Sequence, residues 1–394
     1  MKIVKRILGT LLIIVLLLTG FILLSGKTYL FKVVWYNFAA IDDYRHFPND
    51  TVAVAHPQPW ANSARYNRIA YPDSLNAELE SLQSVGLLMV QDDSVLFEKY
   101  WDGYNDSSYS GSFSMAKSIV GLLIGAELKE GKITSLQDPV GKYLPEFNGS
   151  KYSDTEEPPA GSITDALFRS RLRIIDLLTM SSGSDWNESY LNPLSVTAEL
   201  YYASDVYKTA TGIKIIRRPG TQHRYKSGDT QLLGLILEKA TGKSLAELAS
   251  EKLWRPMGAE HPALWSTDRP GGNEKAYCCF NSNTRDFARL GQLMLDSGKW
   301  NHVSLIDSAY WAASIQPCRL PDEQGQPCTY YGYQWWIDPV HQDVFYARGI
   351  LGQYIIVIPS LHRVIVRLGK KRSPVIENTM PKEVVDLIEW GLHA

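Results

Sequence analysis

The sequence has little cysteine and little net charge. Its 394 residues include four cysteines, too few for the disulfide-dense scaffold of a small secreted protein. With 40 basic and 42 acidic residues the formal net charge is −2, so bulk electrostatics do not favour DNA or RNA as a partner. No internal repeat stands out. Hydrophobic residues make up 45% and charged residues 21%, as in globular proteins, and the length suggests two or three structural units of roughly 150 residues.

The four cysteines form no pattern that requires a metal or a disulfide. Cys318 and Cys328 flank a loop with proline and glycine, and they could bridge each other. Cys278 and Cys279 are adjacent, and a bridge between neighbouring residues is strained. None of the eight histidines lies close by in the sequence to complete a metal-ligand set. We interpret all four as structural cysteines.

A long uncharged run near the N-terminus predicts a membrane anchor. Residues 7–26 are twenty residues without a charge, the length that crosses a bilayer core of about 30 Å as a helix. The alternative is a cleaved signal peptide, but its apolar region is usually about 7–15 residues long, and the run ends in Leu23-Leu24-Ser25-Gly26, a poor cleavage site.

Charge sets the expected orientation of this anchor. Residues 1–31 carry four positive charges and no negative one, which leaves −6 for the remaining residues. Lys2, Lys5 and Arg6 should stay cytoplasmic by the positive-inside rule. We therefore expect a single-pass inner-membrane protein whose bulk faces the periplasm.

The expected organisation is an anchor, a lead-in and one large domain. The anchor covers 1–31, and residues 32–80 have the weak periodicity of a stalk that packs on the domain. The domain covers 81–394, with an α/β part at 81–130 and 300–394 and a mainly helical part at 131–299. A hairpin is expected at 85–90 and 95–101, with further strands at 333–338, 344–348, 354–359 and 363–369. Helices are expected at 114–130, 175–180, 232–240, 285–295 and 382–392.

The order of these elements predicts an α+β fold. Strands occur at both ends of the domain with helices between them, so one sheet should be built from both chain ends and flanked by helices. Hairpin-short connections favour antiparallel neighbours. The helices in the middle form a helical insertion domain.

The first candidate for chemistry is Ser114-Met-Ala-Lys117, at the start of an expected helix. Residues i and i+3 share one helix face, so the hydroxyl and the amine can meet there. Free N–H groups and the positive end of the helix dipole stabilise charge that develops on an attacked carbonyl, and a nearby lysine can activate the serine. The alternative is an N-cap serine beside a solvated lysine, because a lone S-x-x-K arises by chance.

Two further motifs support the catalytic interpretation. Tyr225, in Tyr225-Lys-Ser227, could take the serine proton and return it to a leaving group if the Lys117 cation favours the phenolate. The alternative is a core tyrosine on a loop. Gly349 and Gly352 allow a ligand to approach a strand edge, and the N–H of Ile350 could join that of Ser114 as an oxyanion hole.

Together these residues resemble the class C β-lactamase-related serine hydrolases, in particular the branch with 6-aminohexanoate-dimer hydrolase and related esterases and amidases. The resemblance extends from about Val85 to Gly369 and implies a β-lactamase/transpeptidase-like fold. Besides the motifs above, it rests on the runs 131–139, 142–145, 176–183, 284–291, 331–336 and 348–353.

The resemblance also implies roles for individual residues. Ser114 is then the nucleophile, Lys117 and Tyr225 the proton-transfer pair, and the backbones of Ser114 and Ile350 the oxyanion donors. Tyr190 lies where the amide hydrolases place a substrate-contacting tyrosine. No metal or organic cofactor is implied.

Two departures from the wider superfamily bear on substrate choice. β-Lactamases and penicillin-binding proteins have Lys-Thr-Gly on the edge strand, where this chain has Ala347-Arg348-Gly349. The usual Asn of Tyr-x-Asn is Ser227, a shorter donor. Arg348 could clamp a substrate carboxylate, or it could belong to the other face of the strand. Both departures argue against efficient β-lactam turnover.

The sequence therefore predicts a membrane-anchored serine hydrolase that cleaves a small ester or amide, or a short peptide, through an acyl-enzyme on Ser114. Substrate-binding roles are expected for Tyr190, Ser227, Arg348 and Gly349. One alternative is a penicillin-binding D-alanyl-D-alanine peptidase or β-lactamase. Another is a catalytically silent binding protein with the same fold. A Ser–His–Asp hydrolase is disfavoured because the sequence lacks a G-x-S-x-G elbow. The oligomeric state stays open.

Overall fold

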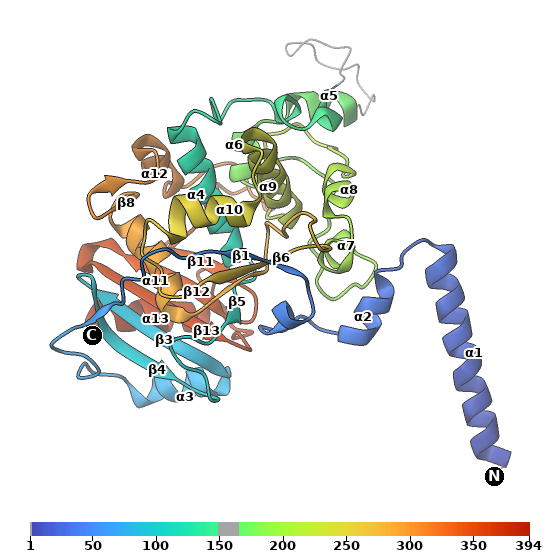
Figure 1. Ribbon diagram of the computed structural model, residues 1–394, viewed down its shortest axis with the longest axis horizontal. Coiled ribbons are helices and arrows are strands. Elements are labelled where there is room, and N and C mark those ends of the chain that lie inside the picture. The colour runs from blue at the N-terminus through green and yellow to red at the C-terminus, as the bar shows by residue number, and fades with distance from the viewer. Residues whose placement is uncertain (1, 149–164) are drawn as a thin grey trace.

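A seven-stranded sheet forms the centre of the computed structural model, which describes residues 2–148 and 165–394 (Figure 1). Residues 149–164, part of the expected helical region, lie outside the described residues. All neighbouring strands are antiparallel except β2 beside β4. In spatial order the strands are β10 (Trp336–Ile337), β11 (Phe345–Gly349), β12 (Gln353–Ile358), β13 (Arg363–Gly369), β3 (Ser84–Gln91), β4 (Ser94–Tyr100) and β2 (Ala61–Asn62).

The two ends of the domain meet inside this sheet, as predicted. Strand β13 pairs with β3 from Arg363 opposite Gln91 to Gly369 opposite Ser84. Strand β3 is buried on both faces, because helices cover the sheet from both sides. One face packs on α11 (Thr284–Leu295), and the other packs on α3 (Asp73–Ser81) and α13 (Lys382–His393). The expected α+β class with an antiparallel sheet from both chain ends is confirmed.

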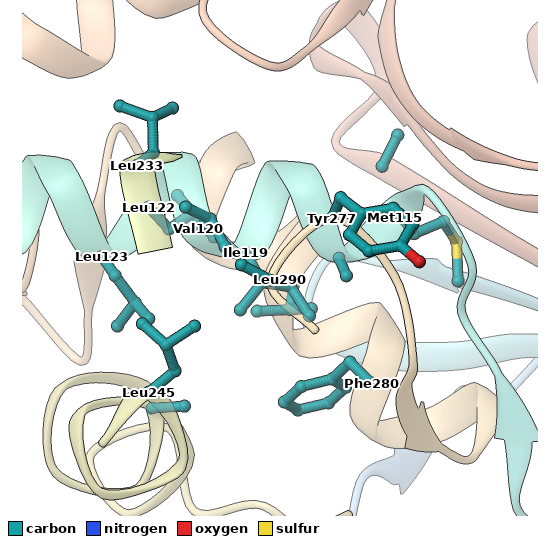
Figure 2. Close-up of a cluster of buried hydrophobic side chains, with 14 of the residues drawn as sticks. Met115, Ile119, Val120, Leu122, Leu123, Leu233, Leu245, Tyr277, Phe280 and Leu290 are labelled. Carbon is teal, nitrogen blue, oxygen red and sulfur yellow. The ribbon is translucent and has the colours of Figure 1, made fainter. Parts of the chain in front are cut away.

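Helix α4 (Met115–Lys129) lies in the larger hydrophobic core between this sheet and the helical region. Its apolar side chains meet residues of α9, α10 and α11, and Figure 2 shows Ile119 and Leu123 in this cluster with Leu233, Leu245 and Leu290. Gly131 has a φ of +73°, the left-handed conformation that ends helices. The remaining helices are α5 (Asp165–Arg171), α6 (Ile174–Leu178), α7 (Val196–Tyr202), α8 (Val206–Thr211), α9 (Ser227–Thr241), α10 (Leu245–Ala249) and α12 (Ser308–Ser314).

A second, four-stranded sheet takes two of its strands, β6 (Ala263–Ser266) and β7 (Phe280–Ser282), from the stretch that the sequence predicted to be mainly helical. It orders β1 (Asn49–Val52), β6, β7 and β5 (Ser110–Gly111). Strands this short carry too few alternating residues to stand out in the sequence. Its first strand comes from the lead-in, whose β2 and α3 also pack on the domain, so much of 32–80 is part of the folded body.

The N-terminus holds one helix that is long and apolar enough to cross a membrane. Helix α1 (Lys2–Leu24) has a mean hydropathy of 3.0 over its most apolar window, and its side chains are almost all exposed. It projects from the body of the molecule, whereas the next helix, α2 (Leu30–Tyr36), packs beside α7 (Figure 1).

Candidate active site

Ser114 is the N-cap of α4, at the junction between the second sheet and the core helix. The preceding residue, Phe113, is buried and has a φ of +44°, an unusual conformation for a bulky side chain. Such backbone conformations persist where surrounding structure holds them, often beside functional residues. Ser114 stays partly exposed and lines a cavity, so its hydroxyl can meet a ligand.

Lys117 points from the first turn of the same helix onto Ser114. Its Nζ lies 3.0 Å from Ser114 Oγ, and it also donates to Ser227 Oγ at 3.1 Å and to the carbonyl oxygen of Tyr277 at 2.9 Å. The side chain is 1% exposed, and this burial lowers its pKa to about 8, although the charge of Glu188 acts in the opposite direction. A lysine with this pKa is partly neutral near pH 7 and is able to accept a proton.

Glu188 completes a hydrogen-bonded chain behind Lys117. Its carboxylate accepts the hydroxyl of Ser227 at 2.6 Å and the backbone N–H of the same residue at 2.7 Å. Trp186 Nε1 and the Tyr190 hydroxyl donate to it at 2.8 and 2.5 Å. Ser227 therefore links the ammonium of Lys117 to a carboxylate.

Tyr225 lies beside this pair, but its chemistry differs from the expectation. Its ring centroid is 5.1 Å from Lys117 Nζ, and its hydroxyl is close enough to Ser114 for that contact to lower its pKa. Burial, reinforced by the charge of Glu188, has the larger effect and raises the pKa of Tyr225 well above its ordinary value. The phenolate considered in the sequence analysis is disfavoured, because burial outweighs the contact with Ser114 and the charge of Arg348, which lower this pKa. Tyr225 is thus held as a phenol, which can donate a proton.

The hairpin between β11 and β12 brings Ile350 to the cavity that Ser114 lines. Gly349 has no room for a side chain, since a Cβ there would lie 2.3 Å from the carbonyl oxygen of Ser112. Gly352 has a φ of +86° and turns the hairpin. Among the described residues, no hydrogen bond outside regular strands and helices uses the N–H of Ser114 or Ile350. Both N–H groups are available for the expected oxyanion.

Of the other two expected substrate contacts, Tyr190 lies at the cavity and Arg348 does not. Tyr190 lines the cavity, with 46% of its surface exposed. Arg348 is not part of the cavity lining. Its guanidinium stacks on the ring of Trp336 at 4.5 Å from the centroid, and it shares the strand face of Tyr346, opposite to that of Ala347. Of the two sequence-based alternatives for Arg348, the other face of the strand is the observed one.

The cavity beside Ser114 has a volume of about 440 Å³, within the range of small-molecule sites. Its lining is mostly aromatic and aliphatic, with few polar groups. The apolar side chains that form it are Phe38, Ala39, Phe113, Tyr190, Leu191, Ala198, Tyr201, Tyr202, Tyr277, Ile350 and Leu351.

The cysteines differ from the sequence-based expectation at Cys278 and Cys279, and the alternative left open for Cys318 and Cys328 is decided. Cys278 and Cys279 form a disulfide although they are adjacent, and Cys278 lines the cavity. Cys279 has a φ of +67°, and this reversal of the backbone brings the neighbouring side chains together. Cys318 and Cys328 are free thiols rather than a bridge.

A histidine does lie near the free thiols, contrary to the expectation from sequence spacing. Ligand atoms of His223, Cys318 and Cys328 fall within 4.8 Å of one another, a set able to hold a metal ion. His223 is about a hundred residues away in sequence, and only the fold brings it there.

Glu188 and Tyr277 belong to the site although no sequence-based expectation named them. Glu188 stands inside the run Asn187-Glu-Ser-Tyr190, so a carboxylate two residues before an expected substrate contact was an available signal. Tyr277 acts through its backbone carbonyl, which no sequence pattern reveals.

Comparison with known proteins identifies the family of this chain. A family model described as Beta-lactamase matches residues 75–386. The chain belongs to the Beta-lactamase family. Its members are serine hydrolases, so the hydrolase assignment and the predicted family are supported.

Individual relatives cover most of the chain. It is 27% identical over 324 residues to 6-aminohexanoate-dimer hydrolase of Paenarthrobacter ureafaciens, covering 77% of this chain and 76% of that protein. It is 30% identical over 383 residues to a provisionally named D-alanyl-D-alanine carboxypeptidase of Escherichia coli K12, covering 78% and 82%. A provisionally named 6-aminohexanoate-dimer hydrolase from Bacillus anthracis has a similar structure, with a TM-score of 0.71, 24% identity and coverage of 88% and 91%. This last likeness confirms the β-lactamase/transpeptidase-like fold.

Proposed function

We propose that this chain hydrolyses small esters or amides through an acyl-enzyme on Ser114. The observation that carries the proposal is the 3.0 Å contact between Lys117 Nζ and Ser114 Oγ beside an apolar cavity. A buried lysine with a pKa of about 8 is suited to act as a base toward the serine hydroxyl.

In the acylation step, neutral Lys117 takes the proton of Ser114 as Oγ attacks the substrate carbonyl carbon. The oxyanion forms beside the N–H groups of Ser114 and Ile350. The C–O or C–N bond then breaks, and the leaving group takes a proton from the phenol of Tyr225, which Lys117 restores. Water repeats the sequence on the acyl-enzyme, releasing the acid and regenerating Ser114.

The test compares Ser114→Ala with Ser308→Ala, an exposed serine at the start of α12. Ser114→Ala should abolish hydrolysis of p-nitrophenyl butyrate and labelling by a fluorophosphonate, with the melting temperature retained. Ser308→Ala should behave like the wild type in all three measurements. Unchanged turnover by Ser114→Ala would refute the proposal. Absence of labelling in the wild type would favour a silent binding protein instead.

A D-alanyl-D-alanine peptidase remains the second candidate, supported by the provisionally named carboxypeptidase from E. coli. Arg348 lies on Trp336 rather than in the cavity, so the edge strand supplies no cation for a substrate carboxylate, and the cation that does line the cavity is Arg372. Covalent capture of labelled penicillin on Ser114 would favour this second function.

We further propose that α1 is an uncleaved anchor and that the catalytic domain faces the periplasm. The support is the length and hydropathy of α1 and the disulfide between Cys278 and Cys279, since disulfides persist in oxidising compartments. Retention of the intact N-terminus, measured by mass spectrometry on protein from carbonate-washed membranes, is the expected result. A mature chain that begins after residue 26 would contradict it.

A further inference from the structure

Helix α2 and the residues after it present a stripe of exposed apolar side chains. Phe31, Val34, Trp35 and Phe38 are 42%, 64%, 82% and 68% exposed. The i, i+3, i+4 spacing of Phe31, Val34 and Trp35 is that of one helix face, and Phe38 follows two residues after α2 ends at Tyr36. In a soluble domain such a face is normally turned toward the core.

The opposite side of α2 explains why this stripe faces outward. Leu30 is 6% exposed, and Val33 and Tyr36 pack in the same small cluster with Phe47 and Tyr202. Tyr36 stacks on Tyr202 with a ring separation of 6.4 Å. Because these contacts fix α2 to α7, the stripe is held on the surface by the fold.

The chain keeps the stripe close to the anchor. Helix α1 ends at Leu24 and α2 begins at Leu30, so five residues separate them. Five extended residues span at most about 18 Å. Side chains of both helices, among them Leu18 and Ile22 with Val34 and Trp35, line one shallow groove, so the two apolar surfaces are continuous. Tryptophan on such a surface is typical of the membrane interface.

The stripe also leads into the catalytic cavity. Phe38 belongs to the stripe and, with Asn37 and Ala39, lines the cavity beside Ser114. Behind this entrance the walls are mostly apolar, formed by Leu191, Tyr201 and other residues already described, although Thr197 and Arg372 also line the cavity. A ligand with a hydrocarbon chain therefore meets apolar surface from the stripe to the serine.

We propose that the stripe formed by Phe31, Val34, Trp35 and Phe38 rests in the membrane interface and that the cavity takes the acyl chain of a membrane-embedded ester or amide. This inference rests on the proposed function and names its substrate class. The carbonyl of the acyl chain reaches Ser114 Oγ, and the chain itself fills the apolar cavity. The leaving group, which is more polar, departs toward solvent.

The experiment uses the full chain in phosphatidylcholine–phosphatidylglycerol vesicles and two substrates. Soluble p-nitrophenyl butyrate reports the proposed function, and p-nitrophenyl palmitate embedded in the vesicles reports the inference. The double variant Val34→Glu, Trp35→Glu is compared with Val303→Glu, Val340→Glu, whose two valines are 62% and 57% exposed elsewhere on the surface.

The stripe variant should lose at least about tenfold in kcat/KM on the embedded ester and keep wild-type turnover of the soluble one. The control variant should keep both. Wild-type turnover of the embedded ester by the stripe variant, or an equal loss on both substrates, would overturn the inference. Failure of the wild type to hydrolyse the soluble ester would instead overturn the proposed function.

A second measurement covers the case in which the double variant does not fold. The fluorescence of Trp35 is the difference between the emission of the wild type and that of Trp35→Phe. Vesicles of dibrominated phosphatidylcholine should quench this fluorescence in the wild type. Soluble esters should also be cleaved faster as the acyl chain lengthens from four to eight carbons, with up to about a fourfold gain in kcat/KM per methylene. Unquenched Trp35 fluorescence or a flat chain-length profile would each contradict the inference.

Discussion

Replacing Glu188 with glutamine should make Lys117 a base at lower pH. The carboxylate of Glu188 accepts from Ser227, whose hydroxyl in turn accepts from Lys117 Nζ. The negative charge favours the ammonium form of Lys117 and opposes the effect of burial. Glu188→Gln removes that charge but keeps the shape of the side chain, so the pKa of Lys117 should fall below its present value of about 8.

The size of this effect follows from the two hydrogen bonds. They span 3.1 and 2.6 Å, which places Lys117 Nζ no more than about 5.7 Å from the carboxylate oxygen. At an effective dielectric constant of about 20, the interaction energy of two charges at this separation is about 3 kcal/mol. Water at the partly exposed carboxylate reduces this energy toward about half of that value. This corresponds to a displacement of about one to two pH units.

The assay is the pH dependence of kcat/KM on p-nitrophenyl butyrate. This dependence reports the pKa values of the catalytic groups in the free enzyme. Since Lys117 acts when neutral, the wild-type rate should rise with pH through about 8, and the acid limb of Glu188→Gln should lie one to two pH units lower. The plateau of the variant falls, because an amide cannot accept all of the hydrogen bonds. Glu377→Gln, on an exposed strand, is the control and should leave the limb in place. A limb that stays or moves to higher pH in Glu188→Gln would refute the reasoning.

Three further predictions address the site and its support. Lys117→Met should lower kcat/KM by about 10²–10⁴-fold, while the melting temperature at pH 7 stays the same or rises because the variant removes a buried charge. The wild type should gain stability between about pH 8 and 10.5, because the pKa of Lys117 is lowered in the folded protein, and the variant should lack this gain. A clear fall in the melting temperature of the variant would contradict this prediction. Glu98→Gln should lower the free energy of unfolding in urea by about 3 kcal/mol, because Glu98 binds Arg285 through two hydrogen bonds of 2.8 and 2.7 Å. Burial opposes ionisation of Glu98, but these bonds and the bond from Tyr100 lower its pKa, so the stability of the wild type should fall as the pH drops below about 4.5. An unchanged midpoint of urea unfolding in the variant would count against this prediction. Gly349→Ala should reduce kcat/KM on short esters by at least about tenfold, because the Cβ of the alanine would displace the strand beside Ile350. Wild-type kinetics in this variant would show that catalysis does not need Ile350 in its present position.

Local relationships in the site were predictable from the sequence, and contacts between loops were not. Ser114 and Lys117 are about one helical turn apart, so their meeting depends on a single helix start, which the sequence placed within one residue of the observed one. The contact of Ser227 with Glu188 joins the first residue of α9 to a loop 39 residues earlier, and no periodicity encodes it. The pKa of Tyr225 depends on burial, and its direction was therefore wrong at the sequence level.

Strands of the main sheet were predicted well where hydrophobic runs are long. Strand β13 occupies 363–369 as expected, and β3 and β4 differ from expectation by one residue at each affected end. Residues 333–338 form a strand only at Trp336–Ile337, because Gln334 has a φ of +64° and buries its side chain against α6 instead. Helix α9 begins at Ser227, five residues before the expected start, since polar residues of its first turn are buried rather than exposed.

The pairing of β3 with β13 has a consequence for how the protein matures. Residues paired across these strands, such as Val90 and Val364, are separated by more than 270 positions, so the central strand has no neighbour on that side until nearly the whole polypeptide has been synthesised. Assembly that waits for such distant partners is slow, and the waiting strand is prone to aggregate. If translocation proceeds from the anchored end, a nascent chain stalled before residue 363 would display the serine and its lysine without a finished enzyme around them. Activity would then appear only after β13 has crossed the membrane.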